Sequence, residues 1–325
     1  RQRQMCIRDR STTLSATAQK KGKAKAKRSI PAVVESPGMK LYKSMIPSTA
    51  KLMFVDSLVV DKKDFLAQIP LISEAGKLSM RDSLHSQYLN EFGDRWIFAH
   101  GDNTSSALYT ADKLADKWST PTPIFNKTEG IEKANYPFLM ADGVTLYFAA
   151  KGGNTMGGYD IFMSTFDHDN GVYYSPENIG LPFNSTANDY LLAIDDIDNL
   201  GWLVTDRRQP EGKVCIYTFV PTASRIGFED TDLSTVEIER YSRILSIADT
   251  WKFGNRKAAM TKLSDIKKRI VAKTIKTQSN NKFVVNDNII YTSANDFKSP
   301  TAKKMYREWL DKKRTLKTVT SKLDE

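Results

Sequence analysis

The sequence has few of the residues that build covalently linked or metal-bound scaffolds. Its 325 residues include two cysteines, Cys6 and Cys215, and three histidines, His85, His100 and His168. Two cysteines exclude a disulfide-built fold and a four-cysteine zinc site, and three histidines leave little room for a histidine-rich metal site. We therefore expect neither a metal nor a cofactor.

Long hydrophobic runs and glycine are also scarce. No run approaches the 18 apolar residues that a transmembrane helix needs. Glycine accounts for only 17 residues, which excludes collagen, and hydrophobic residues make up 40% of the chain. That apolar content excludes global disorder and is enough to bury a core.

Positive charge is scarce in the middle of the chain and abundant at both ends. Residues 1–28 carry ten Lys or Arg and one Asp, residues 29–225 carry 17 Lys or Arg against 24 Asp or Glu, and residues 226–325 carry 21 against 13. The acidic middle would repel phosphate groups, so we do not expect a nucleic-acid partner despite the pI near 9.3.

The N-terminal residues differ from the rest of the chain. Residues 1–10 have no structural period and resemble translated adapter sequence, so we interpret them as a sequencing artefact; a disordered basic tail is the alternative. Ala16 and Ala18 are small residues at the two positions that a signal peptidase recognises. We interpret residues 11–28 as a signal-peptide remnant with a basic linker; the alternative is a Ser/Thr-rich linker. Residues 29–50 then lead into the body of the protein.

The body consists of repeats. Period-2 apolar alternation dominates residues 51–220, which predicts many short antiparallel strands. Segments 92–99, 142–149 and 200–206 align with one another, and each is followed by an aromatic strand. The spacing of about 50–55 residues and the three or four strands per unit are typical of a β-propeller blade; a β-sandwich is the alternative. The side chains expected between blades are Phe98, Tyr147, Phe148, Trp202 and Leu203.

One unit has further specific features. It contains an Asp142-Gly143 turn, a strand at 146–148 and a step from Gly157-Gly158 into Tyr159-Asp160-Ile161, and Pro-Phe-Asn-Ser follows at 182–185. This pattern resembles a TolB-like propeller repeat, although Ala141 stands where such repeats usually have proline. The resemblance covers roughly residues 90–220. It implies an exported, Bacteroidetes-like protein of the Gram-negative cell envelope, in the periplasm or at the outer membrane.

The predicted fold is therefore mainly β: three clear propeller-like blades, with a possible fourth, in residues 51–225, and a basic helical region with a short hairpin in residues 226–325. The stretch 51–60 resembles 283–291, and we expect the two to pair or to help close the ring. Apolar residues on one helical face predict a helix at 256–275: Met260, Leu263, Ile266 and Ile270.

A second helix is expected from Pro300 to the last residue. Its apolar positions step by three and four residues, with Lys312 among them, and form a heptad seam: Met305, Trp309, Leu316, Val319 and Leu323. The seam predicts a coiled-coil partner, and a single amphipathic helix lying on the body is the alternative.

Motifs of catalysis are absent from the sequence. There is no Gly-x-Ser-x-Gly and no Gly-x4-Gly-Lys, and the glycine-rich stretch 151–158 links two strands. The Asp-rich stretches 167–171 and 196–201 lack the distal Glu of a calcium loop, so we interpret them as turns. We therefore expect a scaffold or binding protein and not an enzyme; the alternative is a propeller-based hydrolase acting on glycans.

The candidate binding residues lie in repeat-equivalent loops, where propellers bind their partners. They combine aromatic, amide and charged side chains: Tyr159, Asp160, Asn184, Asn188, Asp189, Asp206 and Arg207. We expect them to recognise an envelope protein, a peptide or a glycan. The alternative is that the Asn and Asp side chains cap turns.

Removal of residues 1–28 should leave the melting temperature within about 1–2 °C of the full chain, because this segment is expected to bury no core. Thermal unfolding followed by circular dichroism measures the difference. A large loss of stability would contradict the assignment of this segment as separable from the fold.

Overall fold

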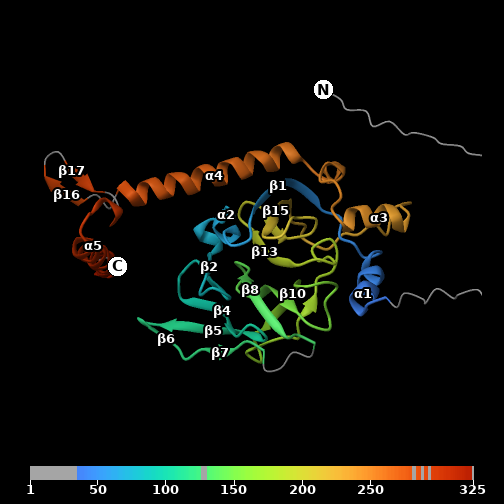
Figure 1. The fold of residues 1–325 in the computed structure, drawn as a ribbon, viewed down its shortest axis with the longest axis horizontal. Helices are drawn as coiled ribbons and strands as arrows, with labels where there is room; N and C mark the ends of the chain where they lie inside the picture. Colours follow the sequence, from blue (N-terminus) through green and yellow to red (C-terminus); the bar gives the residue numbers. More distant parts are fainter. Residues whose placement is uncertain (1–34, 126–129, 280–282, 287–288, 292–293, 324–325) are drawn as a thin grey trace, which may run out of the picture. The chain divides into compact units, whose positions relative to one another are not determined.

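The chain divides into two units, residues 1–35 and 36–325, and the second is described here. The computed structural model describes residues 35–125, 130–279, 283–286, 289–291 and 294–323. Most strands lie in two sheets, one of 11 and one of four strands, and further helices follow them toward the C-terminus (Figure 1). A strand-rich body with a helical tail and a hairpin is thus confirmed, but the described residues show no closed propeller ring.

The strands form three antiparallel meanders in which each strand pairs with the next. The first repeat consists of β3 (Ser86–Leu89), β4 (Arg95–Gly101) and β5 (Ser106–Leu114), extended by β2 (Lys77–Met80), β6 (Lys117–Trp118) and β7 (Thr122–Pro123). The second consists of β8 (Lys133–Leu139), β9 (Thr145–Lys151) and β10 (Asp160–Asp167), extended by β11 (Val172–Tyr173) and β12 (Glu177–Asn178). The third consists of β13 (Asp189–Asp195), β14 (Leu200–Thr205) and β15 (Lys213–Val220), with β1 (Met53–Asp61) as its outer strand.

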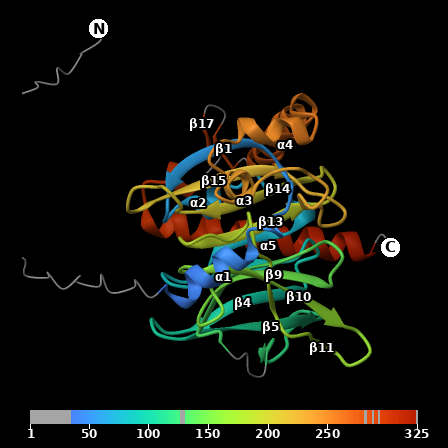
Figure 2. The ribbon, with the colours of Figure 1, turned by 90° about the vertical axis from the view of Figure 1, so that its right-hand side faces the viewer.

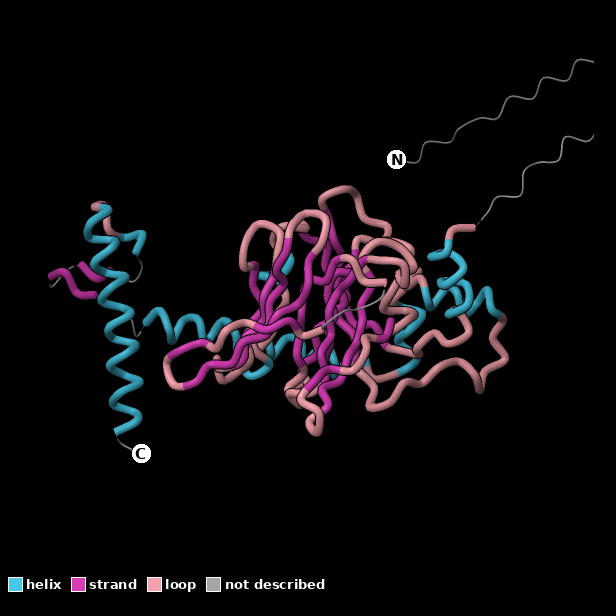
Figure 3. Tube along the Cα trace, turned by 90° about the horizontal axis from the view of Figure 1, so that it is seen from below, coloured by secondary structure: helices cyan, strands magenta, loops and turns pink. Residues whose placement is uncertain are grey.

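The three segments that align in the sequence take the same place in the structure. They fall on β4, β9 and β14, the middle strand of each meander, although the aligned Gly93 and Gly143 precede their strands and Gly201 lies inside β14. Figure 3 shows most strands, drawn in magenta, gathered in one body. We call the strand directly before the middle strand of each meander its inner strand: β3, β8 or β13.

The second repeat lies between the other two. Strand β8 contacts β3, β4 and β5 of the first repeat, and β13 of the third repeat contacts β8, β9 and β10, an order that can be followed in Figure 2. A single parallel pair, Ser106 with Lys133, joins the first two repeats into the 11-stranded sheet. The second repeat packs on the third, and apolar side chains of residues 259–266 join the same core; every residue of β13 and β14 is buried. The expected alternation is therefore wrong for these two strands, because they have no solvent-facing side.

The side chains expected between repeats are in the core. Phe98, Phe148, Trp202 and Leu203 are buried, and Tyr147 is partly buried. The Phe148 ring lies 5.4 Å from that of Phe125 and 6.0 Å from that of Phe162, measured between centroids. Aromatic side chains thus fill the space that the stacked meanders leave.

Strand β1 does not start a repeat of its own. It pairs along its length with β15, while the hairpin β16 (Phe283–Asn286) and β17 (Ile289–Tyr291) pairs with itself. The predicted pairing of 51–60 with 283–291 is therefore wrong. The resemblance between the two segments does not indicate pairing, because β15 is the neighbour of β1.

Helical segments cover part of the strand edges. The free edge of β1 bonds to the 3-10 helix Ala248–Phe253: the backbone N–H of Phe54 donates to Thr250 Oγ1 (2.9 Å), and Trp251 Nε1 donates to the carbonyl oxygen of Phe54 (3.1 Å). Arg256 Nε, at the start of α4 (Arg256–Ser279), donates to the carbonyl oxygen of Val55. An edge strand with unpaired backbone groups invites association, and these bonds remove part of that edge.

The helices begin and pack where the sequence indicates. On α4 the side chains of Leu263 and Ile266 are buried, and those of Met260 and Ile270 pack on the core, which confirms the predicted face. Helix α5 spans Pro300–Leu323 as expected. The other helices are α1 (Pro37–Met45), α2 (Phe65–Gln68) and α3 (Thr235–Ser242). α1 and α3 contribute to a second apolar cluster.

Replacing Phe148 by alanine should lower the free energy of unfolding by about 3–5 kcal/mol, because it empties a buried aromatic site. The matched control is Asp169→Ala in the exposed turn after β10, expected to change stability by about 1 kcal/mol or less. Urea unfolding of both variants provides the measurement. Effects of the opposite order would contradict the packing between repeats.

Candidate functional site

The predicted binding residues form a largely buried polar framework around the loops that enter β10, β13 and β15. Arg207 and Asp189, both buried, form an ion pair of 2.6 Å between Nη2 and Oδ1. Arg207 also donates to the carbonyl oxygens of Pro182 (2.9 Å) and Phe183 (2.7 Å). Ser185 Oγ donates to the second oxygen of Asp189. These contacts hold the 182–185 loop against the start of β13.

Asn184 joins the same loop to the second repeat. Its side-chain oxygen accepts from the backbone N–H of Ile161 (2.6 Å), and its amide nitrogen donates to the carbonyl oxygen of Ile161 (2.8 Å) and to Asn178. Asp160 lies beside this contact and is fully buried. Its Oδ2 accepts from Met156 N and Asn178 Nδ2 at 2.8 Å each, and its Oδ1 has no hydrogen-bond partner within the described residues.

Asn188 and Asp206 complete the framework and connect it to two tyrosines. Asn188 Oδ1 accepts from the backbone N–H of Tyr159 (3.1 Å). Asp206 accepts from the backbone N–H and the side-chain amide of Asn188 and from the hydroxyl of Tyr190, each at 2.8 Å. Most of the predicted residues therefore position other groups and present little of themselves to a ligand.

The groups that they position are three tyrosines, which we call the tyrosine cluster: Tyr136, Tyr159 and Tyr190. The distances between ring centroids are 5.8 Å (Tyr136–Tyr190), 5.9 Å (Tyr159–Tyr190) and 6.2 Å (Tyr136–Tyr159). Burial raises the pKa of all three phenols, that of Tyr136 to about 12, so at neutral pH they are hydrogen-bond donors and not anions. Sequence reasoning selected Tyr159 only.

A signal for the other two was present in the repeats. Tyr136 follows Asn135 in β8, and Tyr190 follows Asp189 at the equivalent place in β13, and each pair lies at a bulge in its strand. A bulge redirects a side chain that regular pleating would place elsewhere. Asn-Tyr and Asp-Tyr at the start of both inner strands were the pattern that could have identified them.

Tyr136 adopts a strained backbone conformation, with φ of +53° before a proline. A bulky residue with positive φ destabilises the fold by about 1–3 kcal/mol, and this conformation persists only where neighbouring groups enforce it. Here Asn135 Oδ1 accepts from Tyr136 N and from both N and Oγ of Ser86 in the first repeat, at 2.9 Å each. A buried polar contact between two repeats thus holds this one tyrosine.

Two lysines border the tyrosine cluster. Lys62 Nζ donates to the hydroxyl of Tyr190 (2.7 Å), and Lys151 Nζ lies 4.6 Å from the ring centroid of Tyr159. Burial lowers the pKa of Lys151, and the charges of Lys133 and Lys62 lower it further. The cluster is therefore set in a region of crowded positive charge.

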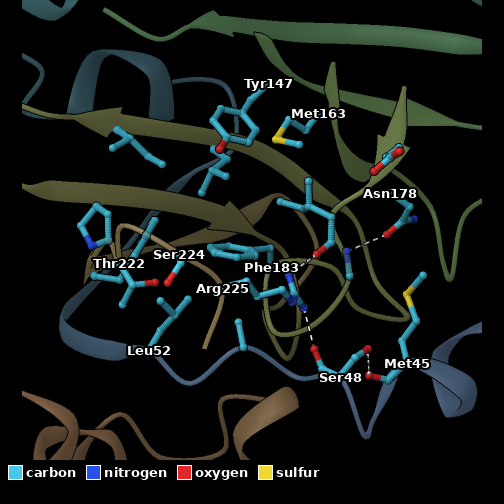
Figure 4. A pocket seen from close by; sticks show the side chains of 18 of the residues that line it. Met45, Ser48, Leu52, Tyr147, Met163, Asn178, Phe183, Thr222, Ser224 and Arg225 are labelled. Carbon is cyan, nitrogen blue, oxygen red and sulfur yellow. Dashed lines mark hydrogen bonds between the residues drawn. The ribbon is translucent and has the colours of Figure 1, made fainter. Parts of the chain in front are cut away.

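A separate cleft of about 560 Å³ lies between the second and third repeats (Figure 4). Tyr147 and Met163 line one side, and Phe183 lies close to Arg225 on the other. Arg225 closes one end by donating to the carbonyl oxygens of Ser48, Ile179 and Leu181. The mainly apolar lining can accommodate an apolar group and offers few partners to a sugar.

Only part of the predicted seam on α5 has described side chains, those of Met305 and Trp309. Trp309 packs on Phe283 of the hairpin, with 5.6 Å between ring centroids, so this residue has a partner within its own chain. Met305 is 64% exposed. The side chains of Leu316, Val319 and Leu323 lie outside the described residues, and the coiled-coil partner stays a prediction.

The Asp-rich stretches are turns. Asp167 Oδ1 accepts from the backbone N–H of Asp169 and Asn170, and Asp195 Oδ1 accepts from those of Ile197 and Asp198. In the part of the chain that the structure describes, no three His, Cys, Asp or Glu side chains are grouped as a metal site would require. No described helix is both long and apolar enough to span a membrane. Cys215 is buried in β15.

Comparison of the chain with protein-family models and with curated proteins finds no match.

Asp160→Asn should remove a pH dependence of stability. Burial, with the nearby charge of Asp189, raises the pKa of Asp160 to about 7, so the folded state binds a proton that the unfolded state releases above about pH 4. The resulting stabilisation is complete below pH 4 and is lost as the pH rises to about 7, by up to about 4 kcal/mol.

The measurement is the difference in unfolding free energy between wild type and Asp160→Asn at pH 4, 5.5 and 7.5. The variant should gain relative to wild type as the pH rises. A difference that does not vary with pH would show that Asp160 is ionised in the fold.

Proposed function

We propose that this chain is a non-catalytic binding protein, whose three repeats are blades of a TolB-like β-propeller and whose binding surface is the tyrosine cluster. Three meanders with equivalent strands in equivalent places support the blade assignment. Tyr136 and Tyr190 lie in β8 and β13, and Tyr159 ends the loop that enters β10; binding residues are often carried by loops on a rigid scaffold.

The observation that carries this proposal is the strained Tyr136. Buried side chains of Ser86 and Asn135 hold it at φ +53°, while Asn188 and Asp206 hold Tyr159 and Tyr190. A strained residue supported by a buried framework points to a preorganised site, because stability alone would favour relaxing it.

The state of the nearby aspartates favours binding over hydrolysis. A glycoside hydrolase needs two carboxyl groups that face the sugar from opposite sides. Asp189 is buried against Arg207, Asp160 is buried behind the loop, and Asp206 accepts three hydrogen bonds. Their structural roles support a site that recognises a ligand and leaves it unchanged.

The place of action that we propose is the periplasm or the outer membrane, and the proposed partner is an envelope protein, a peptide or a glycan. The support is the signal-peptide pattern in residues 11–28 and the resemblance of residues 135–163 to repeats of exported proteins.

Tyr159→Ala should abolish ligand binding without unfolding the protein, because Tyr159 is the half-buried and therefore most accessible member of the cluster. The matched control is Tyr174→Ala, which removes a 57% exposed tyrosine outside the cluster. We expect wild type and the control to bind the same members of an array of bacterial glycans and peptides, and the Tyr159 variant to lose at least about tenfold in signal.

Unchanged melting temperatures would show that both variants are folded. Equal binding by the Tyr159 variant, or no binding by wild type, would contradict the proposal. Release of reducing sugar from a bound glycan would favour the hydrolase instead.

A further inference from the structure

The positive charge beside the tyrosine cluster is not held in ion pairs. Neither Lys62 nor Lys151 forms an ion pair within the described residues. Asp206 is the carboxylate whose charge acts on Lys151, and it already accepts bonds from Asn188 and Tyr190. Lys133 pairs with Lys151 across β8 and β9, which adds a third cation to the region.

Each lysine contacts one of the tyrosines. Lys62 donates a hydrogen bond to the hydroxyl of Tyr190, and Lys151 lies over the ring of Tyr159. The ring centroids of Tyr159 and Tyr190 are 5.9 Å apart. The hydroxyls of Tyr136 and Tyr159 have no hydrogen-bond partner among the described residues, and neither is a fully buried atom. Two phenol donors and two ammonium groups are therefore available in one small region.

A cavity borders part of this region, on the side of Lys62 and Tyr136. It has a volume of about 590 Å³ and is lined by Lys62, Lys63 and Phe65 near α2, by Tyr136, and by the 80–83 turn of the first repeat. This volume is within the range of small-molecule sites. Tyr136 belongs to both the cavity and the tyrosine cluster, so it connects the two.

The acids that line the cavity are already paired. Asp61 bonds to Lys213 (3.0 Å). Asp82 accepts from the backbone N–H of Leu84 and from His85 through its backbone and its ring. Lys62 and Lys63, in the same wall, form no ion pair within the described residues, so their ammonium groups have no carboxylate partner there.

We infer that Lys62 and Lys151, with the hydroxyls of the tyrosine cluster, bind a carboxylate or phosphate group of a small polar ligand such as an acidic sugar. Ammonium and phenol donors both match the oxygens of these anions, and charge-assisted hydrogen bonds are the stronger kind. The inference rests on the proposed function and specifies the class of ligand.

Ligand-observed NMR with three probes tests this assignment: D-glucuronate, D-glucose 6-phosphate and neutral D-glucose. We expect one or both acidic sugars to bind and glucose not to bind, and the stronger of the two distinguishes a carboxylate from a phosphate site. Lys62→Met and Lys151→Met should each weaken binding of the acidic sugar by at least about tenfold, the loss of one charge-assisted hydrogen bond. Lys117→Met removes the same charge from exposed β6 and should change the affinity less than twofold.

Three results would overturn the inference: equal binding of glucose and the acidic sugars, no binding of either acidic sugar, or unchanged affinity in both lysine variants. Array binding that depends on Tyr159 but not on Lys62 or Lys151 would support the proposed function and contradict the assignment of an anionic ligand. If the wild type binds neither the array nor an acidic sugar, the proposed function and the anion assignment are both wrong. Melting temperatures of the lysine variants close to wild type would show that the affinity change is local.

Discussion

The architecture depends on covering both faces of each meander. A three- or four-stranded sheet has two apolar faces, and a single repeat can bury neither by itself. The second repeat and apolar side chains of α4 share one core with the third repeat, where every residue of β13 and β14 is buried. Aromatic residues such as Phe148 pack in the core of the second repeat. Because hydrophobic burial is the main favourable contribution to folding, the order of the repeats follows from it.

The same stacking determines where polar groups must be paired. Loops that enter the interface carry backbone donors away from water, and each needs a partner. Asn184 forms hydrogen bonds with the backbone of Ile161, and Arg207 donates to carbonyl oxygens of the 182–185 loop. Asn135 accepts from the backbone N–H of Ser86 in the first repeat. The residues that resemble binding groups in the sequence are engaged in these bonds, and of the tyrosines that they support Tyr159 is half-buried while Tyr136 and Tyr190 are buried.

Charge follows a related logic. Several aspartates of the body lie in turns and bond to backbone N–H groups, as Asp82, Asp142 and Asp167 do, and these bonds stabilise the carboxylates as anions. Lysines at the inner end, Lys62 and Lys151, gain hydroxyl or aromatic neighbours and no carboxylate. The acidic body therefore contains two lysines, Lys62 and Lys151, that form no ion pair within the described residues.

The sequence alone determined the elements that depend on local pattern: the equivalent strands of three repeats, the apolar face of α4, the start of α5 at Pro300, and the Asp turns. Only the tertiary structure decided which residues meet across repeats. The pairing of β1 with β15, the bulges that redirect Tyr136 and Tyr190, and the burial of Asp160 depend on contacts between segments far apart in the chain. Strand periodicity carries no information about such contacts, because a strand has the same pattern whichever neighbour covers it.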